Sequence, residues 1–187
     1  MRRGFKTEAK TLALELRTEI GLGPHVPFDP YMLAAEYGIR VVPLSALECS
    51  GRDHFLKSDG SALSGALIPD GTSVIILDND AQPVARRRNT VSHELAHVVL
   101  EHEFGVSLAD ERKCGLSGDQ EKEADWLAGE LLIPYAAAFR LARSNAADDD
   151  VAERMSVSLA VARWRMNASG ARKVAARTRG RWAAPQR

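Results

Sequence analysis

Residues 89–100 read NTVSHELAHVVL, and this stretch, in which a charged group interrupts an apolar run, decides the fold. On an α-helix, residues four apart lie one turn apart on the same face, so His93 and His97 can offer two imidazoles to one metal ion. Glu94 lies beside them, where it can take a proton from a water at that metal. This HExxH pattern occurs by chance in about one of every few hundred chains of this length, so its surroundings must decide.

The surroundings favour a metal site. The other faces of the segment are apolar, which is typical of a helix buried in a core; they carry Leu95, Ala96, Val98, Val99 and Leu100. Two histidines and a glutamate would be costly to bury without partners, and a metal ion offsets that cost. The alternative is a core helix whose histidines are satisfied by hydrogen bonds.

A catalytic zinc ion usually takes three protein ligands, so a third must come from elsewhere in the chain. The longer pattern HExxHxxGxxH is absent, because Leu100 replaces its glycine and Glu103 its last histidine. His102 is close by, but the predicted helix extends to about residue 103. On that helix His102 would point away from the metal face.

A glutamate of the next predicted helix is the better source of the third ligand, and the candidates are Glu121, Glu123 and Glu130. Helical spacing predicts that Glu121 shares the buried face with Ala124, whereas Glu123 is rotated off it. We therefore expect Glu121 to be the ligand, with Glu123 as the alternative. Asp125, one turn on, is expected to accept the free N–H of a ligand histidine. The alternative is that no metal binds and these acidic residues only stabilise the N-terminus of the helix, where negative charge is favoured.

Two segments together resemble the ImmA/IrrE family of metallo-endopeptidases. They are residues 88–102, with the HExxH pattern, and residues 121–134, which are similar to the family's ExxAN-x-FA-x-x-LLMP element. Ala96, Asp125 and Leu127 depart from the residues usual in the family, but none of them removes a ligand or the base. The resemblance covers roughly residues 5–170. The spacing of Glu121 and Asp125 is also similar to the ligand and orienting acid of thermolysin-like peptidases.

The resemblance implies a zincin-like fold, a Zn²⁺ cofactor with a gluzincin-like third ligand, and endopeptidase activity. It also implies a protein partner, a helix-turn-helix repressor of stress-response or mobile-element genes, whose cleavage derepresses transcription. Two hypotheses compete with this one. The chain would either bind DNA or sequester a repressor without cutting it.

The remaining elements predict an α+β fold, mostly helical with a small three-stranded sheet. Helices are expected at 7–20, 30–37, 83–103, 119–133 and 135–143, and strands at 39–44, 62–68 and 73–77. The last two strands form a hairpin at Pro69-Asp70-Gly71-Thr72. Residues 1–146 would make the metallopeptidase domain. His54 and Tyr135 are candidates for stabilising an oxyanion, and the residues leave that choice open.

The C-terminal segment has a different pattern. Residues 147–170 predict two short helices that resemble a helix-turn-helix and pack on the main domain, with Ser158 as an N-cap. Residues 171–187 are expected to form a basic, flexible tail. If this end binds nucleic acid, the contacting residues would be Arg163, Arg165, Arg172 and Lys173. A helix pair that closes the core is the commoner arrangement.

Composition excludes several classes. The 187 residues carry 25 Lys and Arg against 25 Asp and Glu, so overall charge favours neither nucleic acid nor an anionic membrane. Cys49 and Cys114 are too few for a disulfide framework and are read as buried or idle thiols. No stretch is typical of a signal peptide or a membrane span. A soluble, cytoplasmic protein is expected.

Overall fold

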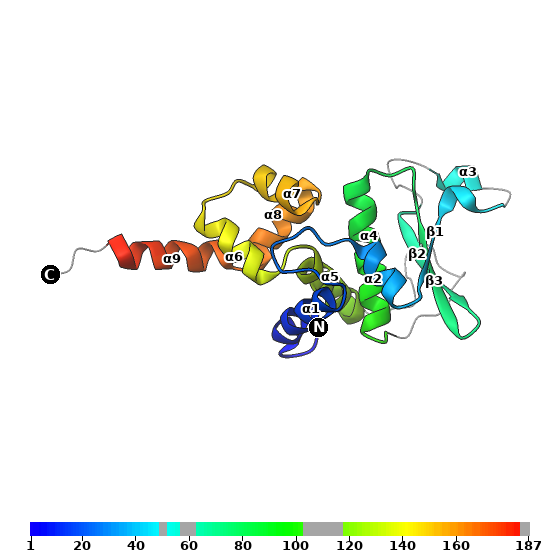
Figure 1. Cartoon of the computed structure of the whole chain (residues 1–187), viewed down its shortest axis with the longest axis horizontal. Coiled ribbons are helices and arrows are strands. Elements are labelled where there is room, and N and C mark those ends of the chain that lie inside the picture. Colours follow the sequence, from blue (N-terminus) through cyan, green and yellow to red (C-terminus); the bar gives the residue numbers. More distant parts are fainter. Residues whose placement is uncertain (49–51, 57–62, 103–117, 184–187) are drawn as a thin grey trace.

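The structure is a computed structural model that describes residues 1–48, 52–56, 63–102 and 118–183. Cys49 and Cys114, with the role expected for them, lie outside these residues. The predicted α+β class is confirmed: helices dominate, and one small sheet stands at one end of the molecule (Figure 1). No helix of the described residues combines the length and the apolar character that crossing a bilayer requires.

The sheet has the order β1-β3-β2. Its strands are β1 (Arg40–Pro43), β2 (Gly65–Asp70) and β3 (Ser73–Asp78), and β1 pairs in parallel with β3. The predicted hairpin joins β2 to β3, with Gly71 at φ 64° in its turn. A short 3-10 turn (Leu44–Ala46) and the helix α3 (Arg52–Phe55) lie between β1 and β2 in the chain.

Helix α4 (Val84–Val99) lies between this sheet and α5 (Gly118–Leu132) (Figure 1). An ion pair fixes its first turns to the sheet: Arg87 Nη2 is 2.6 Å from Oδ2 of the buried Asp78. The Tyr31 hydroxyl donates to the same oxygen from α2 (Pro30–Glu36), a helix that the side chain of Asp29 caps. Because of these contacts the helix that carries the HExxH pattern is held rigidly against the strands.

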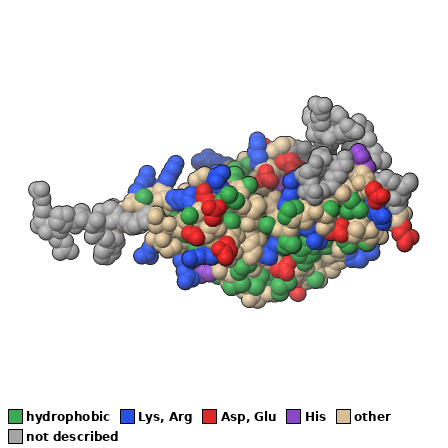
Figure 2. All heavy atoms as spheres, turned by 90° about the horizontal axis from the view of Figure 1, so that it is seen from above, with side chains coloured by type: hydrophobic (Ala, Val, Ile, Leu, Met, Phe, Trp, Pro, Cys, Tyr) green, Lys and Arg blue, Asp and Glu red, His purple; other side chains and the backbone are tan. Residues whose placement is uncertain are grey.

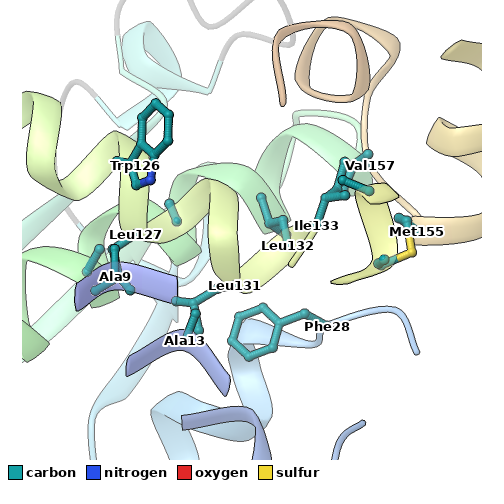
Figure 3. Close-up of a cluster of buried hydrophobic side chains, with 14 of the residues drawn as sticks. Ala9, Ala13, Phe28, Trp126, Leu127, Leu131, Leu132, Ile133, Met155 and Val157 are labelled. Atoms are coloured by element: carbon teal, nitrogen blue, oxygen red, sulfur yellow. The ribbon is translucent and has the colours of Figure 1, made fainter. Parts of the chain in front are cut away.

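Helix α1 (Phe5–Glu19) covers α5 from the other side. Figure 3 shows Ala9 and Ala13 of α1 beside Leu127 and Leu131 of α5. All four side chains are fully buried, and the two alanines let the helices approach closely. Burial of each leucine stabilises the fold by about 1.5–3 kcal/mol. Helix α5 is thus the centre of the core, packed between α1 and α4.

Four helices complete the chain: α6 (Tyr135–Arg143), α7 (Asp148–Met155), α8 (Leu159–Ala168) and α9 (Ala171–Ala183). The predicted pair is present as α7 and α8, and Ser158 caps α8 by accepting from Val161 N at 3.2 Å. Residues 171–183, which were expected to belong to a flexible tail, form the helix α9. Alanine and arginine are strong helix formers, and the buried Ala171 and Ala175 lie on α9, which packs on α6.

Candidate metal centre

Helix α4 brings the two histidines of the HExxH pattern together, as the four-residue spacing predicts. The Nε2 atoms of His93 and His97 are 3.0 Å apart. His97 is buried, and the His93 side chain keeps 21% of its surface exposed. The pair therefore faces a space that opens to solvent on the His93 side.

Glu121, in the first turn of α5, supplies a carboxylate to the same space. Its Oε2 is 3.3 Å from His93 Nε2, and its Oε1 is 3.6 Å from His97 Nε2. Zinc bonds of about 2.0–2.2 Å in a tetrahedron place neighbouring ligand atoms about 3.4 Å apart. The nitrogen–nitrogen distance and the two nitrogen–oxygen distances, which involve different oxygens of Glu121, are close to that value. One ligand atom from each of the three residues lies within 4.8 Å of the others, so together they could hold one zinc ion.

Asp125 takes the position that was expected of it. Its Oδ1 is 3.0 Å from Nδ1 of His93, the ring nitrogen that faces away from Glu121. A carboxylate at Nδ1 keeps the proton there and leaves the Nε2 lone pair for a metal.

The partner of His97 is His102, a residue that was expected to point away from the site. The His102 Nδ1 atom is 2.9 Å from Nδ1 of His97, and both rings are buried. The expected continuation of the helix to about residue 103 is wrong, because α4 ends at Val99. His102 is still not one of the three possible ligands, as expected. Glu101 then adopts a left-handed conformation, with φ 52°, and folds the chain back.

This turn is a Schellman arrangement. The amide of His102 donates to the His97 carbonyl at 3.0 Å, and the amide of Glu101 donates to the Val98 carbonyl at 3.0 Å. Position 102 therefore lies over His97 rather than one and a half turns beyond it. A glycine after the helix would have signalled such a turn, and the sequence has Glu101 there.

Glu123, the alternative ligand, lies behind His102 and not with the other three donors. Its Oε2 is 3.7 Å from His102 Nε2, and the Arg2 amide donates to its Oε1 at 2.6 Å. Its expected exposure was also wrong: the Glu123 side chain is 6% exposed, whereas the Glu121 side chain is 40% exposed. The reason is that α1 and the 101–102 turn bury a face of α5 that would otherwise be open.

The two nitrogens of each ring now have consistent roles. If His97 binds a metal through Nε2, its Nδ1 must carry the proton and donate it to His102. The ring of His102 then has its own proton on Nε2, which faces the carboxylate of Glu123. A continuous chain of polar contacts thus leads from Arg2 through Glu123 and His102 to His97.

Electrostatics favour neutral rings at the deepest positions. Burial, together with the neighbouring rings of His93 and His102, lowers the pKa of His97 to about 3. Burial also lowers the pKa of His93, but the hydrogen bond that His93 donates to Asp125 and the nearby carboxylates outweigh this effect and raise the pKa overall. Burial, aided by Glu121, raises the pKa of Glu94. A carboxyl with a raised pKa can both accept and return a proton near neutral pH.

The other candidate residues lie away from this centre. His54 is in α3 with its ring edge on Phe55, and Tyr135 stacks on Phe139. Within the described ranges, no contact joins either residue to His93, His97 or Glu121.

Three of the four residues predicted to contact nucleic acid form ion pairs within the protein. Arg165 was expected to be exposed on α8, but it is fully buried and pairs with Glu130. Both Arg163 and Arg172 pair with Asp148. Lys173 is exposed. On the face shown in Figure 2, basic side chains are frequent towards the α9 end, with acidic side chains among them.

Comparisons with known proteins agree with this geometry. The family model of the IrrE N-terminal-like domain, Peptidase_M78, matches residues 34–167. Among solved structures, a Mycobacterium tuberculosis transcriptional regulator is similar, with a TM-score of 0.55 at 17% identity over 83% of this chain. The match spans 45% of that regulator's chain, and at this identity it shows a shared fold. A search of curated proteins gives no match.

The family model includes the HExxH helix, the Glu121–Asp125 helix and the α7–α8 pair, and it covers most of the chain. This chain therefore belongs to the family of IrrE N-terminal-like metallopeptidase domains.

Proposed function

We propose that this protein is a zinc-dependent endopeptidase in which His93, His97 and Glu121 hold the ion. One observation carries the proposal: two imidazole nitrogens of α4 and the carboxylate of Glu121 on α5 converge, with one ligand atom from each residue lying within 4.8 Å of the others. Two imidazoles and one carboxylate also suit zinc better than they suit calcium or magnesium, which prefer oxygen ligands.

Zinc in such a site acts as a Lewis acid and lowers the pKa of water towards neutrality. Glu94, next to His93, takes a proton from the attacking water as its oxygen bonds to the peptide carbon. When the C–N bond breaks, Glu94 returns that proton to the leaving amine. Asp125 and His102 hold the two rings in place meanwhile.

Replacement of Glu94 by Gln tests the assignment. Glu94→Gln keeps the shape of the side chain but removes the base, so we expect zinc content to be unchanged and peptide cleavage to fall by about 10²–10⁴-fold. The control Glu153→Gln changes an exposed glutamate of α7 and should alter neither quantity. Cleavage by Glu94→Gln at the wild-type rate would defeat the proposal.

A helix-turn-helix repressor is the substrate class we propose, and cleavage would release its target genes. The family resemblance supports this choice, and the similar structure that carries a regulator's title is in keeping with it. A repressor encoded beside the gene of this chain is the first to assay. Two fragments produced by the wild type, but not by Glu94→Gln, would support cleavage. Tight binding without fragments would instead favour sequestration.

A further inference from the structure

A pocket of about 300 Å³ opens between α4, α5 and α8, directly beside the candidate metal centre. His93 and Asp125 line it and also belong to the centre. Its other walls are mainly apolar and come from Ala128 of α5 and from Ala160, Val161 and Trp164 of α8. A group held in this pocket would therefore contact the ring of His93, which is itself one of the candidate metal ligands.

The α8 wall of this pocket is anchored rather than loose. A Cβ atom on Gly129 would be 2.6 Å from Cζ3 of Trp164, so the glycine makes room for this indole against α5. Trp164 also meets Trp126 edge to face, with ring centroids 6.3 Å apart. The next residue, Arg165, is buried, pairs with Glu130 and donates to the Ile133 carbonyl at 3.0 Å. The pocket is thus preformed.

The pocket lining has few polar groups, and its one carboxylate already has a partner within the protein. Asp125 engages His93, and Asn89 is the other polar residue. A charged side chain placed on the α8 side would lose hydration and gain no ion pair there, whereas an apolar one would gain by leaving water. Of the occupants that a peptide can offer, a large apolar side chain suits this lining best.

We propose that this pocket is a specificity site, which receives a large apolar side chain (Leu, Ile, Met or Phe) at a position flanking the scissile bond. The inference rests on the proposed peptidase function and extends it to the choice of substrate. It also gives α8 a role in reading a peptide rather than DNA. A basic side chain that reaches Asp125 is the competing occupant.

Two matched variants test the pocket. Ala160 and Ala136 are both exposed and both stand at the second residue of their helices, α8 and α6, and only Ala160 lines the pocket. An aspartate at either position is favoured by the helix N-terminus, so both proteins should fold. Ala160→Asp puts a negative charge into the pocket, and Ala136→Asp is the control.

The zinc-loaded protein is first incubated with a synthetic peptide library, and the cleavage sites are read by mass spectrometry. We expect Leu, Ile, Met or Phe to be enriched at one flanking position. For a peptide pair that differs there as Leu or Lys, kcat/KM should favour Leu by about tenfold or more. Ala160→Asp should lower this ratio at least about tenfold, and Ala136→Asp should leave it within about twofold. Because it is a ratio, partial loss of zinc does not affect it.

The specificity-site proposal is contradicted if cleavage shows no preference at either flanking position, or if Ala160→Asp leaves the preference unchanged. Either result would leave the peptidase proposal standing. If no peptide is cut, the same library is captured on immobilised Glu94→Gln. Enrichment of apolar residues, lost in Glu94→Gln with Ala160→Asp, would then support the pocket while the peptidase proposal fails. Capture without such enrichment, or no capture at all, overturns the pocket as well.

Discussion

At the scale of single residues, each histidine that we propose as a ligand has a different group at its Nδ1 atom. His93 has an exposed carboxylate there, Asp125, whereas His97 has the buried ring of His102. An imidazole can accept one hydrogen bond and donate another, so His102 passes the influence of Glu123 on to His97. Removal of such outer partners typically costs 10–100-fold in metal affinity.

We therefore expect His102→Ala to weaken zinc binding by about 10–100-fold, as measured by competition with a chromophoric chelator. His102→Asn should recover part of the loss, because its amide oxygen can still accept from His97 Nδ1. His25→Ala changes an exposed histidine and serves as the control. Wild-type affinity in His102→Ala would show that the contact between the rings has no effect on the ligand.

At the scale of elements, the end of α4 decides where His102 lies. A residue other than glycine in the left-handed conformation costs roughly 1–2 kcal/mol, and Glu101 bears that cost in the turn. The Schellman hydrogen bonds and the packing of His102 hold it there.

Glu101→Gly should thus leave the free energy of unfolding unchanged or raise it by up to about 1 kcal/mol. Glu101→Val should lower it by roughly 1–2 kcal/mol, because a β-branched residue resists positive φ, and should also weaken zinc binding by displacing His102. Glu153→Val, within α7, should cost only about 0.5 kcal/mol in helix propensity. Denaturant unfolding of the zinc-free proteins measures all three. Equal losses in both valine variants would contradict this account of the turn.

At the scale of the whole molecule, the candidate centre joins the two central helices. His93 and His97 belong to α4, and Glu121 belongs to α5, so a bound ion would tie the sheet half of the protein to the α1–α5 half. Binding that requires the folded arrangement adds its free energy to the stability of the fold.

Zinc at about a hundred times its dissociation constant should therefore stabilise the fold by about 2.7 kcal/mol. For a chain of this size we expect a rise in Tm of roughly 5–10 °C, reversed by a chelator. Glu121→Gln should lose most of this shift, whereas Glu123→Gln should keep most of it, because Glu123 lies behind His102. A shift that Glu123→Gln abolished and Glu121→Gln retained would exchange the roles of the two glutamates. Calorimetry with and without zinc provides the measurement.

Regular spacing and local turn signals were enough to predict much of this molecule. The four-residue repeat of His93 and His97 requires a shared helix face, and Gly71 marks a hairpin whatever surrounds it. The segments that resemble the peptidase family could be recognised for the same reason, since ligand and base must keep a constant spacing along each helix.

Four features depended instead on contacts between distant segments: the burial of Glu123, the burial of Arg165, the return of His102 over His97 and the order of α9. Helical periodicity indicates which residues share a face but not how many faces the neighbouring helices cover, and α5 is covered on nearly all of its faces. The turn at Glu101 has no glycine to announce it, and it is held by the hydrogen bonds and burial that the folded chain supplies. Which groups support the metal ligands is therefore set by packing, because their partners come together only when α1, α4 and α5 assemble.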